Sequence, residues 1–518
     1  MVSHRHIARS TGVLAVSTGL SRVLGFVRDL LLAGLFGTGA QAQAFVIAFR
    51  LPNLMRDFVG EGAMSSGVVP VLSSYRAKGQ PEEFWRLSQS LLTRMCVILC
   101  AIGLVGTLAA PQIVRVIAPG FIEEPDKFRL TVQLTRILFP FITLVGLWAY
   151  FMGLLNSLRH FAMPALGPAV LNLAMIIACL WGVSLTTPGI LAVAIAVMIG
   201  GVIQLVMQLP VAVRLGFRWR WRWRHPGVGE VLRLIGPRMV GSGAYQVNVL
   251  VHTALASLSG IVGNGAVVAL YFANRLVQLP LALFGTASAQ ASLPSLSEQA
   301  AQNDLAGMRD TLLSVIRIIG FVMLPSMVGL IVLALPIVGG LFERGAFDHG
   351  STLMTAQAVI YYAFGLLAYA VSRVLTGAFY ALRDTRTPVT LAIEAVVVNV
   401  LFSLALMWPM QIGGLALAAA IANILNAARL TRSLERRLGA SLLVPALGPL
   451  SRQAGAALLM GPGCWAVSRL VGESPPWVGL PLMVLAGIAC YVGSCVLFRV
   501  PEFSTALRWL RTVPSASE

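Results

Sequence analysis

Long apolar stretches recur about every 35 to 40 residues along almost the whole chain. A helix needs about 20 mostly apolar residues to cross the hydrocarbon core of a bilayer, and in lipid only helices and closed barrels satisfy every backbone polar group. Of the 518 residues, 57% are hydrophobic and only 11% are charged. These features predict an all-α, polytopic membrane protein.

We expect about fourteen transmembrane spans, with ends placed to within several residues. They are predicted at residues 8–36, 42–71, 87–110, 130–157, 163–184, 189–213, 230–257, 265–292, 309–336, 352–380, 388–408, 412–433, 452–471 and 477–498. Connections on one side, such as 214–224 and 432–437, are rich in arginine, whereas alternate connections such as 259–265 contain almost none. The positive-inside rule therefore predicts that both termini lie in the cytoplasm.

The net charge of +18 does not indicate nucleic-acid binding, because the basic residues lie mainly in short connections and no soluble domain accompanies them. In Arg218–Arg224, arginine alternates with tryptophan. This segment is most simply an interfacial anchor, with its rings at headgroup depth and its guanidinium groups on anionic lipid; a site for a specific partner is the alternative. The six cysteines lie in apolar segments without metal-ligand spacing, so we expect no metal and no cofactor.

The two halves of the chain repeat each other. Arg50-Leu51 is followed by Gly60 and Pro70, as Arg275-Leu276 is followed by Gly285 and Pro294. The offset is six spans, an even number, so the halves have the same orientation, as in transporters built from parallel repeats. We therefore predict two six-helix lobes plus two C-terminal helices, at residues 1–225, 226–438 and 439–518. Transporters of this kind bind substrate between the lobes and work by rocking them.

The first span contains three charges midway along its length: Arg22, Arg28 and Asp29. Arg22 lies ~20 Å from either end, too far for its side chain to reach the interface. A charge there costs at least a few kcal/mol against hydrocarbon, so it must face protein or a water-filled cavity. Arg28 is rotated by ~120° from the helix face of the other two, and a bend near Gly19 or Gly25 is expected to bring all three to one cavity.

Two other spans contain polar residues that we expect to line the same cavity. They are Arg50, Asn53, Arg56, Asp57 and Glu61 in span two, and Tyr271, Asn274, Arg275 and Gln278 in span eight. One interpretation is structural, with ion pairs of Arg28 with Asp29 or of Arg56 with Asp57 and Glu61. The acids cannot neutralise every arginine, however, and guanidinium groups bind phosphate through paired hydrogen bonds. The expected substrate is therefore anionic and amphiphilic, with a diphosphate as the matching group.

The chain resembles the MurJ (MviN) lipid II flippases of the MOP exporter superfamily over nearly its whole length. The segments on which the resemblance rests are Ser21–Asp29 (SRVLGFVRD), Phe49–Arg56 (FRLPNLMR) with Glu61–Ala63, Asn274–Pro280 (NRLVQLP), Leu341–Phe347 (LFERGAF) and Ala381–Pro388 (ALRDTRTP). The resemblance implies transport of undecaprenyl-diphosphate-linked MurNAc-pentapeptide-GlcNAc from the cytoplasmic to the periplasmic leaflet of a bacterial inner membrane, for peptidoglycan synthesis. Partners in the cell-wall synthesis machinery are left open.

The resemblance also implies roles for particular residues. Arg22, Arg28, Arg56 and Arg275 correspond to essential cavity arginines, with Asp29 beside them. Spans thirteen and fourteen are expected to form a groove for the lipid tail. Many relatives have an acid where this chain has Gln43, and some have acids where it has Asn274 and Gln278, so this cavity should be more positive than theirs.

A sodium site found in some relatives has lost its carboxylate ligands in this chain. Its aspartates align with His252 and Ser403, beside Asn399, which leaves too little anionic oxygen for tight Na⁺ binding. We therefore expect coupling to membrane potential or protons. His252 is either a packing residue or a proton-linked switch, with Glu394 as the nearest acid that the sequence offers.

Three other functions compete with this prediction. A MOP-type exporter of another polyprenyl-linked oligosaccharide or of a small molecule fits the architecture, although exporters of cationic drugs need acids in the cavity. An enzyme is not expected, because the loops contain no paired aspartates, nucleophile elbow or histidine-rich phosphatase pattern. A channel or passive scaffold would not explain a parallel repeat around an arginine-rich centre.

Overall fold

The structure is a computed structural model that describes residues 4–56, 64, 67–471 and 474–504. Within these residues every regular element is a helix, as predicted. The chain divides into two compact units: residues 1–259 with 344–347, and residues 260–343 with 348–518. The lobe boundaries expected from the repeat stay a prediction.

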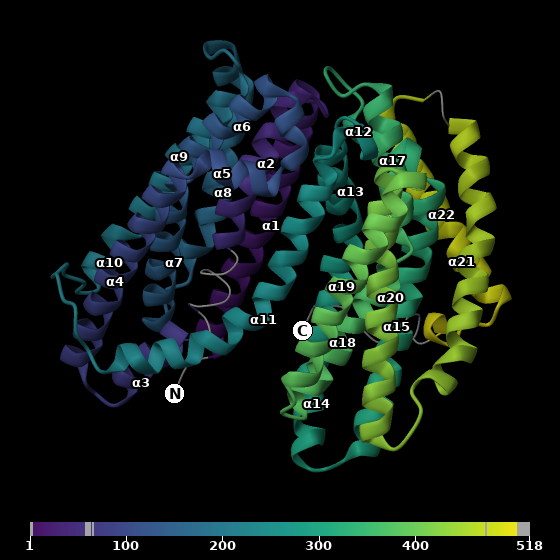
Figure 1. Cartoon of the computed structure of the whole chain (residues 1–518). Coiled ribbons are helices and arrows are strands. Elements are labelled where there is room, and N and C mark those ends of the chain that lie inside the picture. Colours follow the sequence, from purple (N-terminus) through teal and green to yellow (C-terminus); the bar gives the residue numbers. More distant parts are fainter. Residues whose placement is uncertain (1–3, 57–63, 65–66, 472–473, 505–518) are drawn as a thin grey trace. The chain divides into compact units, whose positions relative to one another are not determined.

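Within the described part of the first unit, the helices α1 to α11 follow one another along the chain (Figure 1). They are α1 (His4–Phe36), α2 (Ala40–Arg56), α3 (Val69–Ala77), α4 (Pro81–Leu108), α5 (Ala110–Ile117), α6 (Pro125–Leu138), α7 (Phe141–Ser157), α8 (Ala162–Ile177), α9 (Ile190–Val206), α10 (Leu209–Arg214) and α11 (Gly227–Ala256). Short η2 (Pro119–Glu123), η3 (Ala178–Gly182) and η4 (Val183–Leu185) complete the unit.

The second unit begins within the short α12 (Ser259–Val262). Its other helices are α13 (Ala266–Pro280), α14 (Thr286–Ala301), α15 (Leu305–Val332), α16 (Ala334–Phe342), α17 (His349–Ala363), α18 (Leu366–Ala381), α19 (Arg386–Met410), α20 (Ile412–Leu438), α21 (Leu443–Val471) and α22 (Pro476–Leu497), with the π-helical η5 (Leu281–Gly285) joining α13 to α14.

Ten helical stretches among the described residues are long and apolar enough to cross a membrane. An eleventh is obtained if α17 and α18, bent by 46° at their junction, form one span. These eleven correspond to the predicted spans three to six and eight to fourteen. The three remaining predicted spans, 8–36, 42–71 and 230–257, each include residues whose side chains lie outside the description.

Small residues allow the helices of the first unit to pack closely. A Cβ on Gly146 of α7 would lie 2.4 Å from Leu99 of α4, and one on Gly106 would lie 1.7 Å from the ring of Phe139. A methyl group at either position would force the neighbouring side chain to move, and small residues at such contacts let membrane helices approach each other closely. The fully buried Tyr150 adds a polar link, since its hydroxyl lies 2.6 Å from Ser88 Oγ.

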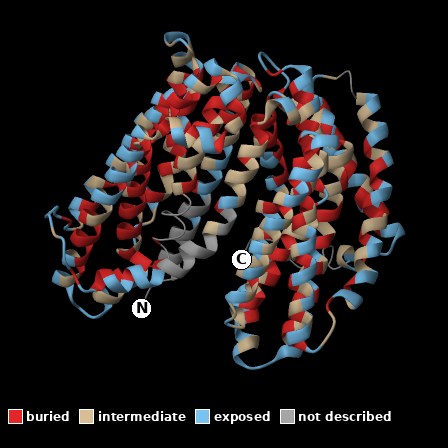
Figure 2. Ribbon diagram, in the orientation of Figure 1, coloured by how far each residue is buried: buried red, intermediate tan, exposed pale blue. Residues whose placement is uncertain are grey.

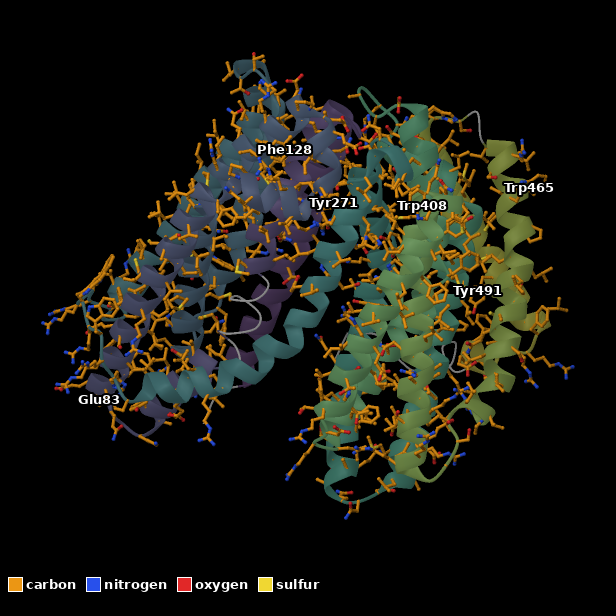
Figure 3. The ribbon with its side chains drawn as sticks, viewed as in Figure 1. Glu83, Phe128, Tyr271, Trp408, Trp465 and Tyr491 are labelled. Atoms are coloured by element: carbon orange, nitrogen blue, oxygen red, sulfur yellow. The ribbon has the colours of Figure 1, made fainter. Side chains whose placement is uncertain are left out.

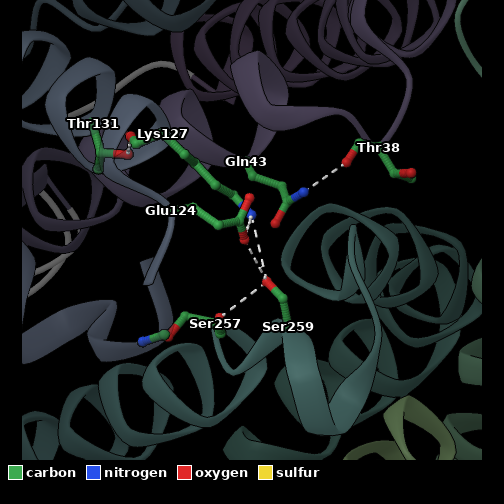
Figure 4. A network of polar contacts seen from close by, with 8 residues as sticks. Thr38, Gln43, Glu124, Lys127, Thr131, Ser257 and Ser259 are labelled. Atoms are coloured by element: carbon green, nitrogen blue, oxygen red, sulfur yellow. Dashed lines mark hydrogen bonds and ion pairs between the residues drawn. The ribbon is translucent and has the colours of Figure 1, made fainter. Parts of the chain in front are cut away.

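A second polar network joins the end of α11 to the α5–α6 connection (Figure 4). The buried Lys127 donates to Glu124 Oε1 over 2.9 Å and lies 4.3 Å from the centre of the Phe121 ring. Ser259 donates to the same carboxylate oxygen, and Ser257 Oγ accepts from Gly120 N. These contacts fix the C-terminal end of α11 within the first unit.

A short segment of the α16–α17 connection belongs to the first unit, although both its neighbours in the chain belong to the second. In this segment, Arg344–Phe347, Ala346 N donates to Gly34 O over 2.8 Å. Gly37 has φ +54°, and a Cβ there would lie only 2.0 Å from Ala346 O. The segment therefore docks on the end of α1 through backbone contacts that require glycine.

The core of the second unit lies between α15, α18 and α20, where Leu312, Leu375 and Leu434 are fully buried. The C-terminal pair α21 and α22 packs on α15 through a separate apolar cluster, and Tyr491 donates to Phe321 O over 2.9 Å. Buried residues recur on α21 at steps of three and four, so one face of that helix is covered and the rest is exposed (Figure 2).

Candidate functional site

Arg28 and Asp29 form a buried ion pair in the last third of α1. Arg28 Nη2 and Nε both donate to Asp29 Oδ1, over 2.6 and 3.1 Å, and Nη1 donates to Asn172 Oδ1 of α8 over 2.8 Å. All three side chains are buried. The ion pair that the structural interpretation predicts is therefore present, and Asn172 extends it to a second helix.

Gly25 makes room for this arrangement. A Cβ on Gly25 would lie 3.3 Å from Asn172 Nδ2, the atom that donates to Ser21 O over 3.1 Å. α1 continues as one helix through Gly25, and Arg22 is exposed while Arg28 is buried. Gly25 therefore allows the close approach of α8, and α1 is not broken at this residue.

The polar residues predicted in span two lie along α2, which continues through Pro52. Arg50, Asn53 and Arg56 are all half-buried. Asp57 and Glu61, which the sequence places on the same stripe, lie outside the described residues.

Gln43, which stands earlier on α2, is buried and donates to Thr38 O over 3.0 Å. It thus joins α2 to the turn that precedes it.

In the second unit, α13 presents Asn274, Arg275 and Gln278, all three exposed. Arg275 Nη2 donates to the hydroxyl of Tyr271 over 3.1 Å, and the guanidinium carbon lies 5.2 Å from the centre of that ring. Tyr271 is labelled in Figure 3. A tyrosine one helical turn earlier therefore holds the guanidinium group by a hydrogen bond and a cation–π contact.

The same arrangement recurs at Arg373 of α18, a residue that was not among the predicted site residues. Arg373 Nη2 donates to Tyr369 Oη over 3.0 Å, its guanidinium carbon lies 5.1 Å from that ring, and Nη1 donates to Thr286 Oγ1 of α14 over 3.3 Å. Two signals could have found it: a charge inside predicted span ten, and a tyrosine four residues earlier, as at Arg275.

The residues predicted for ion coupling fall in both units. His252 is half-buried on α11 of the first unit. In the second unit Asn399 and Ser403 are buried on α19, where Ser403 Oγ donates to Asn399 Oδ1 over 3.4 Å. Glu394 forms an ion pair with Arg429 of α20. Arg429, from the neighbouring helix, is thus the observed partner of this acid.

The arrangement provides exposed guanidinium groups within apolar helices: Arg22 in the first unit, and Arg275 and Arg373 in the second. A guanidinium group stays protonated at any physiological pH and offers donors in a planar fork. In a poorly hydrated environment such donors bind phosphate oxygens strongly. The chemistry that these positions support is recognition of an anion.

The chain is similar to proteins of one family over nearly its whole length. The family model described as "Lipid II flippase MurJ" matches residues 32–473. "Probable lipid II flippase MurJ" of Vibrio cholerae is 32% identical over 513 residues, 96% of this chain and 97% of that protein. "Lipid II flippase MurJ" of Burkholderia cenocepacia is 32% identical over 496 residues, 94% of each protein.

Solved structures agree with these matches. A lipid II flippase MurJ in an inward closed conformation is 25% identical, with a TM-score of 0.78 over 94% of this chain and 98% of that one. An inward-facing multidrug resistance MATE family transporter of the MOP superfamily has a TM-score of 0.69 over 82% of this chain and 98% of that one; at 14% identity it shows the fold alone. The chain belongs to the MurJ family of lipid II flippases.

Proposed function

We propose that this chain moves lipid II, the undecaprenyl-diphosphate-linked precursor of peptidoglycan, from the cytoplasmic to the periplasmic leaflet by alternating access. The observation on which the proposal rests is the set of exposed arginines within apolar helices, Arg22, Arg275 and Arg373. A cation at such a position is costly unless it meets an anion or water. The diphosphate of lipid II is an anion with the geometry that a guanidinium fork matches.

Support for two of these arginines comes from their tyrosines. Tyr271 and Tyr369 each accept a hydrogen bond from one Nη2 atom and stack beside the guanidinium group. A group oriented in this way loses less rotamer freedom when it binds phosphate. In this proposal Arg275 and Arg373 contact the diphosphate, and Asn274 and Gln278 contribute neutral hydrogen bonds to the head group.

Arg28 and Asp29 have a different use in this proposal. Because the carboxylate already neutralises the guanidinium group, and Asn172 accepts a third hydrogen bond, the pair contributes little net charge to an anion site. It holds α1 against α8 and thereby positions Arg22 two turns earlier on α1. Arg50, Asn53 and Arg56 provide further polar groups on α2.

The lipid tail requires an apolar surface outside the polar site. α21 and α22 offer one, since large apolar side chains on both helices are exposed, among them Leu458, Trp465, Leu482, Leu485 and Ile488. In this proposal the undecaprenyl chain lies along these helices, in a bacterial inner membrane, with both termini of the protein in the cytoplasm.

The energy source in this proposal is membrane potential or a proton gradient. Asn399 and Ser403 supply neutral oxygens, whereas tight sodium binding needs carboxylates. Glu394 is held by Arg429. Transport by purified protein should therefore respond to an imposed potential or pH gradient and not to a sodium gradient; dependence on sodium alone would contradict this part of the proposal.

The transport proposal is tested with purified protein in liposomes that contain fluorescent lipid II. A membrane-impermeant reagent that destroys fluorescence on one side measures movement between leaflets. We expect the chain to move lipid II, and Arg275→Lys to slow this movement at least tenfold, because one ammonium group cannot replace the fork. Arg383→Lys, at an exposed position in a connection, is the matched control and should retain activity. Equal rates with and without the chain would reject the proposal.

A further inference from the structure

The connection between α10 and α11 contains an extended segment, Arg218–Arg224, here called the strap. Its backbone is fixed to one face of α4. Gln89 Nε2 donates to Arg218 O over 2.9 Å, Arg222 N donates to Thr93 Oγ1 over 3.2 Å, and Arg94 Nε donates to Trp223 O over 2.8 Å. The backbone of the strap is therefore held in place by α4, although the strap belongs to no helix.

Buried residues fix both ends of the strap. Before it, the buried Phe217 packs against Trp85 and Phe151, with ring centres 6.3 and 5.4 Å apart. After it, the buried His225 accepts from Gly227 N at Nδ1 and so donates from Nε2 to Glu83 Oε2, over 3.0 Å. Glu83, labelled in Figure 3, lies in the first turn of α4. These anchors hold the strap along the end of a helix long and apolar enough to cross a membrane.

The side chains of the strap point away from this support. Trp219, Trp221 and Trp223 are 61%, 56% and 48% exposed, and Trp221 and Trp223 pack edge to face, as residues two apart on an extended chain can. The alternate residues are arginines: Arg218, Arg220 and Arg224 are exposed and Arg222 is half-buried. Among the described residues, no carboxylate forms an ion pair with any of the four.

Alternating indole rings and guanidinium groups suit the head-group layer of a membrane. Tryptophan is favoured at the level of the lipid head groups, where its ring is buried and its N–H stays wet, and arginine beside it is drawn to anionic lipid. A soluble acidic partner would satisfy the arginines but would have to cover three tryptophans as well. The strap lies beside the N-terminal half of α4, a helix long and apolar enough to cross a membrane.

We propose that the strap is a preformed binding site for the head groups of anionic phospholipids such as phosphatidylglycerol. The four guanidinium groups contact lipid phosphates, and the three indole rings lie among the glycerol and upper acyl groups. Because α4 and its anchors hold the backbone, the site exists before the lipid binds. It fixes the α10–α11 connection of the first unit to the membrane surface, independently of the transport proposed above.

The test uses the purified full-length chain in detergent, titrated with phosphatidylglycerol and, separately, with phosphatidylcholine, with bound lipid counted by native mass spectrometry. We expect tighter binding of phosphatidylglycerol. Arg220→Gln should weaken it about fivefold, and changing all four strap arginines to glutamine should weaken it more than 25-fold at low ionic strength. The preference should shrink as salt is added.

Two comparisons make the test specific. Four exposed arginines of the second unit, Arg383, Arg386, Arg432 and Arg436, are changed to glutamine as a matched set, which should reduce binding far less than the strap set. Changing the three strap tryptophans to leucine should weaken binding of both lipids alike. Arg220→Gln leaves every backbone anchor in place, so it gives an answer even if the fourfold variant fails to fold.

The inference is wrong if the strap variants bind phosphatidylglycerol like the unmodified chain, or if the second-unit set loses as much affinity. It is also wrong if the strap variants keep their lipid binding but lose binding to polyglutamate, since the strap would then be a site for an acidic protein.

Discussion

The docked segment Arg344–Phe347 offers a sharp test of how the first unit is built. Ala346 N donates to Gly34 O, and Gly37 lies directly beneath the carbonyl of Ala346. In Gly37→Ala the new methyl carbon would lie 2.0 Å from Ala346 O and 2.7 Å from its carbonyl carbon. These distances are far shorter than van der Waals contact, so the segment must move away from α1.

The size of the effect follows from the two contributions of the methyl group. The φ of +54° at residue 37 adds about 1 to 2 kcal/mol of backbone strain for an L-residue, whether or not the segment is docked. The overlap with Ala346 destabilises only the docked state, and its cost is that of an overpacked contact, about 1 to 3 kcal/mol. The amide of Ala346 should therefore exchange with solvent about 5 to 150 times faster in Gly37→Ala.

Hydrogen–deuterium exchange measured by mass spectrometry on peptides that cover residues 340–348 is the appropriate assay. Gly493→Ala is the matched control, because a Cβ at Gly493 of α22 meets no atom within 4 Å. It should leave exchange at Ala346 unchanged and should stabilise α22 slightly. Unchanged exchange at Ala346 in Gly37→Ala would refute the docking described here, provided that peptides from α15 exchange at the rate of the unmodified chain.

Three further predictions concern stability, measured as the thermal unfolding midpoint in detergent. Burial raises the pKa of the Asp384 carboxyl, but hydrogen bonds from Thr387 and the charge of Arg437 outweigh it and keep that pKa below 3.8. The stability that the ionised Asp384 carboxyl contributes is complete above its pKa in the unfolded chain and is lost as the pH falls through its pKa in the folded chain. Asp384→Asn should therefore lower the unfolding midpoint at neutral pH and match the unmodified chain well below pH 3.8. An equally lowered midpoint at all pH values would contradict this. Asn172→Leu should cost about 1 to 3 kcal/mol, because a buried guanidinium N–H loses its acceptor, and a midpoint equal to that of the unmodified chain would contradict the role of the amide. Gly106→Ala should cost about 1 to 3 kcal/mol through overlap with a buried ring, and a raised midpoint would show that the ring can move aside.

The helical fold could be predicted from sequence because hydropathy and span length are local properties. Every predicted span from 87–110 to 189–213, and from 265–292 to 477–498, has a counterpart in an observed helix or helix pair. The ends differ by several residues, since the helices extend past the bilayer-length apolar core. For example, the predicted span 265–292 corresponds to a continuous helical stretch from Ala266 to Ala301, which ends later.

The chemistry of the site was only partly predictable, because the partner of a charge is set by distant residues. Arg28 and Asn172 are 144 residues apart, and nothing local in either span indicates that they meet. Glu394 was proposed as a neighbour of His252, yet its observed partner is Arg429. Arg373 was not predicted, although it is a charge inside the predicted span 352–380. The residues proposed to contact substrate stay a prediction.

The central claim is that guanidinium forks within apolar helices hold the diphosphate of a lipid substrate. Its most direct test compares the equilibrium binding of undecaprenyl diphosphate and undecaprenol to the purified chain, and repeats the comparison with Arg275→Lys. These ligands differ only in the charged group, so the ratio of the two affinities isolates its recognition. We predict a strong preference for the diphosphate that falls about 10- to 150-fold in the variant, since charge-assisted hydrogen bonds contribute about 1.5 to 3 kcal/mol. Equal affinities for both ligands, or a preference that Arg275→Lys leaves intact, would contradict the claim.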